Sequence, residues 1–556
     1  MSPLRIPSQS SLTLAAVLAA GSLVQCAGAP RRFANRPPMW TDTDTRPLHR
    51  APHEYFSPLL WDGADHMVFR PLTRALWVET GREAANVNAL DEVPDSSWYQ
   101  NRLATHALTP DEVHDGACAG QPMPDANGTW TILSSKPNGW FPGFVARGPD
   151  GRRYLMKADG VVQAEQTTTG DIVGSRIFWA AGYYAPCNRS VRLIPSSLQL
   201  GPNAHFEDSL GHDHPMTMHE LDDVLAHARH YEDGSYRFGI SLFVEGRPLG
   251  PFTYEGTRDD DPNDVIPHED RRDLRGARLL SAWINHWDAR EQNTLTSWID
   301  TGNNTGYVRH YMIDFGDTLG SMWPVDGLNR RLGHDGYFYL DHVLGDFLSL
   351  GTVDRPWDHP HTDPNGWIFG YFNESPFDPA GWRSGYDNPA YSRMTERDGA
   401  WMARIVARFS NAHIHALVGA ANLSFQPWAE SLERILRVRR DRILERYLTR
   451  LSSLADVQVE GTRVCANDRA IEAHLYPRAR YRVEWLGDGR NERGELLTEV
   501  TNAGSRVCIP LPESSAPGYA VFRVTAAPEG RRAERPIRMH LYAMGGGQYS
   551  LAGVER

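Results

Sequence analysis

The stretch from residue 279 to residue 316 constrains the fold of this chain more than any other. Its first six residues, Leu279 to Ile284, have the apolar content of the end of a buried helix. A polar loop follows at residues 286–293, and Asp300 to Gly306 has the composition of a hairpin turn. The β-branched and aromatic residues before Asp314 favour a strand. The pattern therefore predicts a helix, a polar loop and a hairpin whose second strand ends at Asp314.

The polar residues of this stretch include the groups that phosphoryl transfer requires. A carboxylate must orient the acceptor hydroxyl, and an amide oxygen and a second carboxylate must hold magnesium against the phosphates. Asp288 precedes Asn293 by five residues, and both precede Asp314-Phe315-Gly316. Together with His286, these residues resemble the catalytic loop and the metal-binding tripeptide of protein kinases. The resemblance implies that Asp288 is the catalytic base and that Asn293 and Asp314 bind Mg²⁺ with ATP. The alternative is a surface loop in which these residues occur by chance.

A kinase-like site also needs a phosphate-binding lysine and an acidic partner for it. Residues 144–157 predict two strands joined by a Pro-Asp-Gly turn, and the second strand ends in Lys157. Residues 164–182 carry apolar side chains at helical spacing. We expect Lys157 to bind phosphate and Glu165 to pair with it, with Asp171 as the alternative partner. An acidic residue near a helix start also suits the helix dipole.

Other segments refine the resemblance toward atypical kinase-like proteins. Residues 134–143 stand where a glycine-rich phosphate loop is expected, but they lack the GxGxxG pattern. Trp179-Ala180-Ala181-Gly182 resembles the segment that ends the Glu-bearing helix of HipA-type bacterial kinases, and spore-coat CotH-type kinases are similar in core. Residues 86–98 and 261–264 resemble a family of bacterial lipoproteins with the same core. The kinase-like part covers about residues 126–452.

The fold class that follows is α+β, with a bilobal kinase-like core between an N-terminal extension and a small C-terminal β-sandwich. A chain of 556 residues suits several domains, because single cores rarely exceed about 250–300 residues. After Leu454 the hydrophobic period of 3.6 gives way to short alternating strands at residues 481–485, 506–509, 520–524 and 537–542. The predicted parts are a signal (1–29), a tether and extension (30–125), an N-lobe (126–250), a helical C-lobe (251–454) and a β-sandwich (455–556). Residues 240–246 predict the hinge, where Glu245 is expected to contact the nucleotide.

The N-terminus predicts export. An apolar stretch at residues 12–24 follows Arg5 and is too short to span a bilayer as a helix. Cys26, three residues after Leu23, resembles the acylated cysteine of a bacterial lipoprotein. Acylation would anchor the protein to the membrane in the cell envelope, periplasmic or at the outer membrane. Ordinary cleavage after Ala29, which gives a secreted protein, is the open alternative.

The remaining cysteines fit an oxidising compartment. Cys118, Cys187, Cys465 and Cys508 form an even set, which predicts two disulfides in an exported chain. We favour Cys465 with Cys508, because both lie in the C-terminal region, and Cys118 with Cys187 by elimination. Buried free thiols are the alternative.

Charge and motif together select a class of function. The formal charge of −12 argues against non-specific nucleic-acid binding, which draws its affinity from Lys and Arg. The pattern favours an exported, ATP- and Mg²⁺-dependent phosphotransferase that acts on a protein or cell-envelope acceptor. A catalytically inactive pseudokinase scaffold and an envelope- or carbohydrate-binding lipoprotein are the alternatives. Scarce nucleotide outside the cytoplasm favours the scaffold, whereas the complete set of Lys157, Asp288, Asn293 and Asp314 favours the enzyme.

Overall fold

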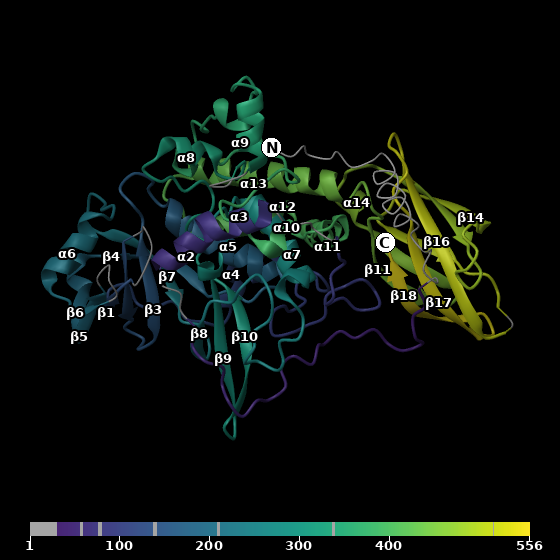
Figure 1. Ribbon diagram of the computed structural model, residues 1–556, viewed down its shortest axis with the longest axis horizontal. Coiled ribbons are helices and arrows are strands. Elements are labelled where there is room, and N and C mark those ends of the chain that lie inside the picture. Colours follow the sequence, from purple (N-terminus) through teal and green to yellow (C-terminus); the bar gives the residue numbers. More distant parts are fainter. Residues whose placement is uncertain are drawn as a thin grey trace, which may run out of the picture.

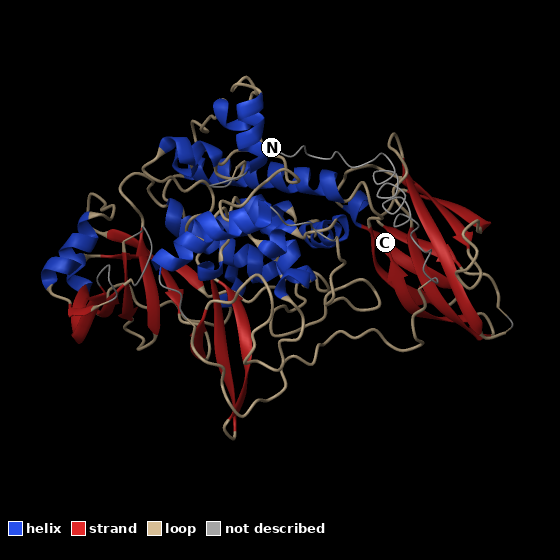
Figure 2. Cartoon of the chain, viewed as in Figure 1, coloured by secondary structure: helices blue, strands red, loops and turns tan. Residues whose placement is uncertain are grey.

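The computed structural model describes residues 31–55, 59–75, 81–136, 142–207, 212–335, 340–514 and 516–556. In these residues four sheets and many helices form a mixed α+β structure, as predicted. Strands lie at both ends of the long axis and helices lie between them (Figure 1, Figure 2). Among the described residues, none of the helices combines the length and apolar character that crossing a bilayer requires. Cys26 and the predicted signal lie outside the described residues.

A seven-stranded sheet, ordered β4-β7-β3-β2-β1-β5-β6, forms one end of the molecule. Its strands are β1 (Trp130–Ser135), β2 (Gly143–Arg147), β3 (Arg153–Ala158), β4 (Asn188–Leu193), β5 (Leu198–Glu207), β6 (Asp213–Pro215) and β7 (Tyr236–Leu242). Strands β2 and β3 form the hairpin predicted at residues 144–157. Lys157 lies in β3, opposite Gly143 of β2 and Gly239 of β7, so it is near the middle of the sheet.

Two helices cover the two faces of this sheet. Met156 packs in one cluster with Leu221 of α6 (Met218–Ala226). Lys157, the next residue, points to the opposite face because side chains alternate along a strand. Helix α5 (Gln166–Ala181) lies on that face, since a Cβ on Gly239 would stand 3.3 Å from Thr168 of α5. The side chain of Lys157 therefore points toward α5, the helix that follows β3 in the sequence.

A second sheet brings the polar loop at residues 286–293 and Asp314 together. Helix α7 (Arg272–Ile284) precedes the loop, and β9 (Thr294–Gly302) and β10 (Thr305–Met312) form the predicted hairpin. Strand β8 (Arg247–Gly250) completes the three-stranded sheet. Asn303 and Asn304 close the hairpin with φ of 54° and 56°, a conformation that Asn tolerates better than most residues. Met312 pairs with Thr294, so the two ends of the hairpin return to the same place.

The central region is helical. Its helices are α2 (Leu59–Ala64), α3 (Arg70–Ala75), α4 (Pro110–Asp115), α8 (Asp326–Arg331), α9 (Leu340–Leu348), α10 (Pro389–Ser392), α11 (Glu396–Val406), α12 (Asn411–Ala421) and α13 (Gln426–Tyr447). A π-helical turn at Asp65–Phe69 joins α2 to α3. Helices α11 and α12 are separate, because Ser410 caps α12 by accepting a bond from His413 N.

The C-terminal region contains two sheets. One is ordered β11-β12-β15 and the other β14-β13-β16-β17-β18. The strands are β11 (Leu454–Glu460), β12 (Arg463–Asp468), β13 (Ala479–Trp485), β14 (Glu495–Asn502), β15 (Arg506–Pro510), β16 (Gly518–Pro528), β17 (Ile537–Gly545) and β18 (Gln548–Glu555), with helix α14 (Arg469–Glu472) after β12. The four strands predicted from alternation correspond to β13, β15, β16 and β17. Their description as a sandwich stays a prediction.

Both favoured disulfide pairings are present in the structure. Cys465 and Cys508 face each other across β12 and β15 and are bonded. Cys118, which follows α4, is bonded to Cys187, which precedes β4. The second bond ties the N-terminal extension to the large sheet, although the two cysteines are 69 residues apart.

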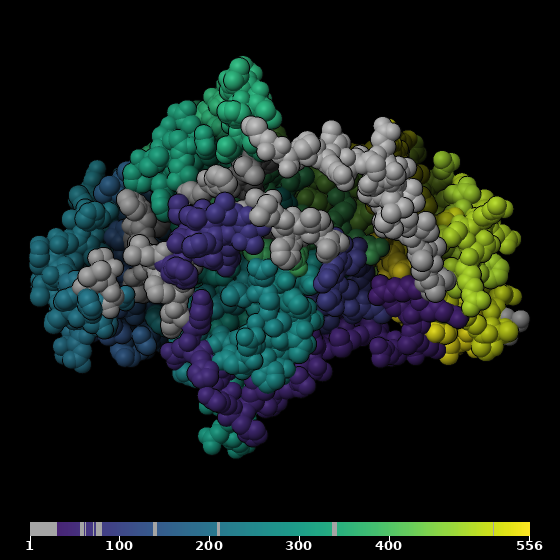
Figure 3. Space-filling model, viewed as in Figure 1, coloured from purple at the N-terminus to yellow at the C-terminus, as the bar shows by residue number. Residues whose placement is uncertain are grey.

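The segment predicted as a tether contacts both the C-terminal strands and the β8–β10 sheet. Tyr542 OH donates to Phe33 O in the C-terminal region. Leu48 pairs with Gly306 at the hairpin, and Tyr55 N donates to Leu249 O in β8. In the space-filling view this part of the chain runs along one edge, and the purple part of the α2–α3 segment lies on the visible face, left of its centre (Figure 3).

Candidate active site

The residues of the site come from separate parts of the chain. Lys157 lies in β3 and Asp171 in α5, whereas Asp288 and Asn293 follow α7 and Asp314 follows β10. Backbone pairing sets the last two groups side by side, because Ile313 N donates to Asn293 O at 3.1 Å. The structure thus brings together the four residues of the sequence pattern, Lys157, Asp288, Asn293 and Asp314, and also Asp171, the alternative partner of Lys157.

Lys157 forms two ion pairs. Its Nζ lies 2.6 Å from Asp314 Oδ1 and 3.1 Å from Asp171 Oδ2. Burial opposes the charged ammonium, but Asp171 and Asp314 outweigh it and raise the pKa of Lys157. Asp171 Oδ1 also accepts a bond from Phe315 N at 2.9 Å. Asp171 therefore links the lysine to the backbone that carries Asp314.

The predicted pairing of Lys157 with Glu165 is wrong. Glu165 bonds instead to Arg237 at 3.2 Å and accepts a bond from Tyr231 OH at 2.6 Å. Its backbone is left-handed, with φ of 61°, just before the first residue of α5. The turn directs its carboxylate away from Lys157, and Asp171, a turn and a half further along the helix, takes that place. Asp171 is the alternative that the sequence left open.

The polar loop is held by its own residues. Asn293 Nδ2 donates to Asp288 Oδ2 at 2.8 Å and to Asp288 O at 2.6 Å. These bonds use the amide nitrogen and leave the amide oxygen as the atom suited to a cation. Arg290 Nε lies 3.0 Å from Asp288 Oδ1. Burial raises the pKa of Asp288 to about 6, although Arg290 and Asn293 act in the opposite direction.

The end of α7 fixes where this loop begins. Asn285 closes the helix in a left-handed conformation, with φ of 54°, as Asn commonly does. Arg439 of α13 then binds the last carbonyls, donating to Ala282 O at 2.6 Å and to Trp283 O at 2.8 Å. A cation suits the negative end of a helix. The loop therefore starts from a rigid helix terminus.

His286 occupies the position of the kinase-loop histidine. Its ring centroid lies 5.5 Å from that of Phe315 and 6.4 Å from that of Phe178 in α5. Burial lowers the pKa of His286 to about 4, so the ring is neutral at pH 7. Within the described part of the chain its Nδ1 has no hydrogen-bond partner. These contacts indicate that His286 packs the loop against Phe315. They do not indicate a role for His286 in proton transfer.

Asp314 stands on strained backbone beside two glycines of α5. Its φ of 55° is unusual for a residue other than glycine, and such strain is concentrated at functional sites. A Cβ on Gly170 would stand 2.8 Å from Phe315 O, and one on Gly174 would stand 2.6 Å from Phe315 Cβ. The two glycines allow the loop of Asp314 to lie directly on the helix that carries Asp171.

Two further charged groups of the site, Asp317 and Lys136, were not predicted from the sequence. Asp317 lies close enough to Asp288 and Asp314 for their charges to act on it, and burial with these charges raises its pKa to about 7. Lys136, at the end of β1, lies within electrostatic reach of Lys157 and Asp314, and burial followed by Lys157 lowers its pKa. Asp317 directly follows the tripeptide, which was the available signal. For Lys136 the sequence offered no signal beyond its place in residues 134–143, where a phosphate loop is expected.

The donor set fits a divalent cation. The carboxylate of Asp314 and the amide oxygen of Asn293, on neighbouring segments, are oxygen ligands of the kind that Mg²⁺ prefers, and the charges of Asp288 and Asp317 act on the same region. Burial, followed by repulsion from Asp288 and Asp314, raises the pKa of Asp317, and a bound cation would relieve that repulsion. Lys157 and Lys136 bring positive charge to the same region, which suits phosphate oxygens.

A helical segment of the N-terminal extension covers the loop. His66 bonds to Glu291 Oε2, and Arg70 Nη1 lies 2.5 Å from Glu291 Oε1. Burial alone would raise the pKa of Glu291, but His66 and Arg70 hold it at about 2. The segment containing α2 and α3 therefore belongs to the surroundings of the site, a role the sequence did not indicate.

Glu245 lies in the connection from β7 to β8, at the predicted hinge. Its side chain is largely exposed and its Oε2 lies 2.9 Å from Arg309 Nη1 of β10. Its backbone oxygen accepts a bond from Ser297 Oγ at 2.6 Å. The connection is thus fixed to the hairpin, and nucleotide contact by Glu245 stays a prediction.

Comparison with known proteins gives weak similarities. The chain matches no family model, and no curated protein matches it. Among solved structures it is similar to the Golgi casein kinase with Mn/ADP bound, with 9% identity and a TM-score of 0.31, over 79% of this chain and 91% of that one. A second structure of the Golgi casein kinase has 10% identity and a TM-score of 0.29, over 61% of this chain and 77% of the other. At these TM-scores the likeness carries no argument, and the interpretation of the site depends on its own residues.

Proposed function

We propose that this protein is an exported kinase-like phosphotransferase that moves the γ-phosphoryl group of Mg-ATP to a protein or cell-envelope acceptor. The observation that supports this most strongly is the convergence of Lys157, Asp171, Asp288, Asn293 and Asp314 on one site. Phosphoryl transfer needs little covalent chemistry from the protein, so a lysine, a metal-binding pair and a carboxylate base form the essential set.

Each residue has a role in the proposal. Asn293 and Asp314 would hold Mg²⁺, which when bound neutralises charge on the phosphates. Lys157, positioned by Asp171, would bind phosphate oxygens. Asp288 has a pKa of about 6 and is therefore mostly ionised at neutral pH, as a base that accepts the proton of an acceptor hydroxyl must be. The seven-stranded sheet and the helical region would form the two lobes of a kinase-like core, and the C-terminal sheets a β-sandwich.

Two carboxylate variants test the assignment. Asp314→Asn should lower both Mg²⁺-dependent ATP binding and transfer, because it removes a metal ligand. Asp288→Asn should leave ATP binding largely intact and lower transfer by about a hundredfold or more, because a base acts on the transition state. Binding is measured as the rise in melting temperature with Mg-ATP, since a native-state ligand at a hundredfold excess over Kd stabilises by about 2.7 kcal/mol. Transfer is measured with labelled γ-phosphate and an envelope extract.

Asp300→Asn is the matched control, because Asp300 lies at the exposed end of β9 and should change neither quantity. Wild type that binds Mg-ATP but transfers no more than Asp288→Asn over a broad acceptor screen would indicate the pseudokinase scaffold. Wild type that shows no stabilisation by Mg-ATP would favour the two non-catalytic alternatives, the scaffold and the envelope-binding protein, over the enzyme.

We also propose that Cys26 is acylated and that the protein is held in the cell envelope. The two disulfides support export, because such bonds persist in oxidising compartments. Release of Cys26→Ser from the membrane fraction would support acylation, and equal retention of the variant and wild type would contradict it.

A further inference from the structure

A cavity lies away from the candidate active site, where the helical region meets the C-terminal strands. Its volume is about 300 Å³, the lower end of the range for small-molecule sites. Helix α11 and strand β11 line it, together with parts of the N-terminal extension around Trp40 and Leu90. None of the residues proposed for phosphoryl transfer belongs to it.

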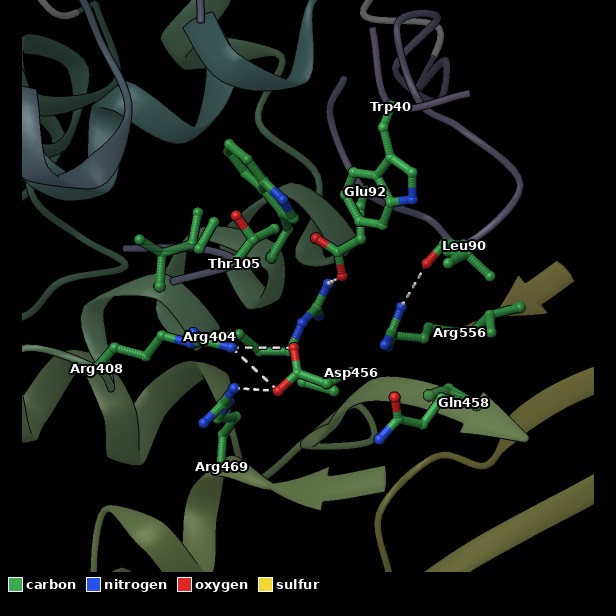
Figure 4. Close-up of a pocket in the computed structure, with 16 residues that line it drawn as sticks. Trp40, Leu90, Glu92, Thr105, Arg404, Arg408, Asp456, Gln458, Arg469 and Arg556 are labelled. Atoms are coloured by element: carbon green, nitrogen blue, oxygen red, sulfur yellow. Dashed lines mark hydrogen bonds and ion pairs between the residues drawn. The ribbon is translucent and has the colours of Figure 1, made fainter. Parts of the chain in front are cut away.

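Arginines dominate the lining. Arg404, Arg408, Arg469 and Arg556 line the cavity with only two acidic residues, Glu92 and Asp456. Figure 4 shows these side chains entering from several sides, with Asp456 between them and Trp40 at one border. Among the residues that line the cavity, arginines therefore outnumber acidic residues.

The arginines that line the cavity differ in how many acidic partners they have. Asp456 accepts bonds from Arg408 Nη2 at 3.0 Å and is also bonded to Arg469. Arg556 Nη1 lies 3.2 Å from Asp91 and Arg469 bonds to Glu472, both acids outside the lining. One carboxylate thus serves two guanidinium groups.

Arg404 has the fewest partners. Its side chain is 4% exposed, and Nη2 lies 3.1 Å from Glu92 Oε1. Within the described residues, Arg404 Nη1, Arg469 Nε and Arg556 Nε are buried without a hydrogen-bond partner. Buried guanidinium donors normally have acceptors, and each exception calls for an explanation such as a bound ion.

The charges also act on one another. Burial and then Arg404 lower the pKa of Arg556 to about 10, and burial and then Arg469 lower the pKa of Arg408. Asp456 stands at a β-bulge of β11 with φ of 52°, a strained conformation that directs its carboxylate to Arg408 and Arg469. An anion in the cavity would relieve the repulsion among the arginines.

We propose that this cavity binds a small phosphoryl ester, with its phosphoryl oxygens on the arginines and its uncharged part against Trp40. Several guanidinium groups converging from different sides suit a tetrahedral dianion better than a planar carboxylate, which one arginine satisfies in bidentate fashion. The apolar side of the lining, with Leu90, Ile405 and Val457, suits the uncharged part. The volume limits that part to about the size of a pentose. The site does not depend on the proposed phosphotransferase activity.

Calorimetric titration of the full chain with inorganic phosphate and with ribose 5-phosphate tests the proposal. Both should bind, and the ester more tightly. Arg404→Gln should weaken both about tenfold or more, because a hydrogen bond to a charged group contributes about 1.5–3 kcal/mol. Asp456→Asn should strengthen both, because it removes a competing carboxylate. Trp40→Ala should weaken the ester alone. Arg490→Gln, an exposed arginine elsewhere, should change neither.

The outcomes separate a ligand site from a structural arginine network. Absence of binding by wild type at about 10 mM of either probe, where a site with a Kd of about 1 mM would be mostly filled, would overturn the proposal. Binding unchanged by Arg404→Gln, or by Arg408→Gln if the first variant does not fold, would also overturn it. Binding of inorganic phosphate without binding of ribose 5-phosphate would contradict the proposal that the ligand is an ester. Titration in a Lys157→Met background keeps any phosphate bound at the candidate active site out of the comparison.

Discussion

At the scale of single residues, the most important feature of the site is which acidic residue forms the ion pair with Lys157. Asp171 reaches the ammonium and also accepts the bond from Phe315 N, so one carboxylate positions both the lysine and the Asp314 loop. Glu165 is equally buried but serves Arg237 and the backbone N of Ser424. Two acidic residues six positions apart therefore have different functions, and only one of them belongs to the site.

This difference is measurable. Asp171→Asn should lower transfer by about a hundredfold, because a mispositioned lysine no longer stabilises charge on the phosphates. Glu165→Gln should lower the free energy of unfolding, since Arg237 loses a buried partner, while transfer per folded molecule stays close to wild type. Both variants are compared by urea unfolding and by labelled transfer. The reverse result, with Glu165→Gln inactive and Asp171→Asn active, would restore Glu165 as the partner.

At the scale of elements, the close contact between α5 and the loop of Asp314 depends on two glycines in the helix, which have no side chains. Gly170 and Gly174 face Phe315 with no room for a Cβ. Glycine in a helix normally costs stability relative to alanine, about 0.5–1 kcal/mol. Its presence at these two positions is explained by the close approach of the loop.

Gly174→Ala should therefore destabilise the protein by about 1–3 kcal/mol and lower transfer, because the added methyl group would displace Phe315. Gly419→Ala in α12 is the matched control, since a Cβ there meets nothing within 4 Å. It should stabilise the protein by about 0.5–1 kcal/mol and leave transfer unchanged. Thermal unfolding and the transfer assay give both quantities. Equal effects of the two substitutions would contradict close packing at Gly174.

At the scale of the whole molecule, the N-terminal extension joins the helical region to the C-terminal strands. Asp91 bonds to Arg272 of α7 at 2.6 Å and to Arg556 at 3.2 Å, and these two arginines hold the pKa of Asp91 at about 2 against the effect of burial. Val554 N also donates to Ala89 O. One buried apolar cluster extends from Val93 through the helices to Val554. The regions are therefore packed on one another.

The junction after α13 makes global stability depend on pH. Glu534 Oε2 accepts a bond from Ser453 N at 3.2 Å, and Tyr476 OH donates to Glu534 Oε1 at 2.9 Å. Burial and then Asp468 raise the pKa of Glu534 from its ordinary value of 4.5 to about 8. The folded protein thus keeps a proton that the unfolded chain releases above about pH 4.5, and this contribution to stability is full below that pH and lost as pH rises through about 8.

Glu534→Gln, which resembles the protonated side chain, should remove this dependence. Between about pH 5 and about pH 8 the free energy of unfolding of wild type should fall relative to the variant by up to about 1.4 kcal/mol per pH unit. Denaturant unfolding at several pH values measures the difference. Parallel curves for the two proteins would show that Glu534 is not protonated in the folded state.

The sequence by itself determined the features that depend on neighbours along the chain. The spacing of Asp288 and Asn293, the hairpin before Asp314, and the strand that carries Lys157 follow from local composition and periodicity, and all appear in the structure. The pairings of the four cysteines outside the signal were also favoured correctly. The catalytic roles assigned to these residues stay predictions.

Only the tertiary structure decided which distant groups meet. The left-handed turn at Glu165 keeps its carboxylate away from Lys157, and Asp171 forms the ion pair instead. The hydrophobic periodicity of the sequence does not indicate such a turn. Lys136, the helical segment that covers Glu291, and the arginine cavity around Arg404 likewise depend on how separate elements pack. The physical reason is that periodicity fixes which face of an element is buried, whereas the partner at that face is set by the packing of side chains far apart in sequence.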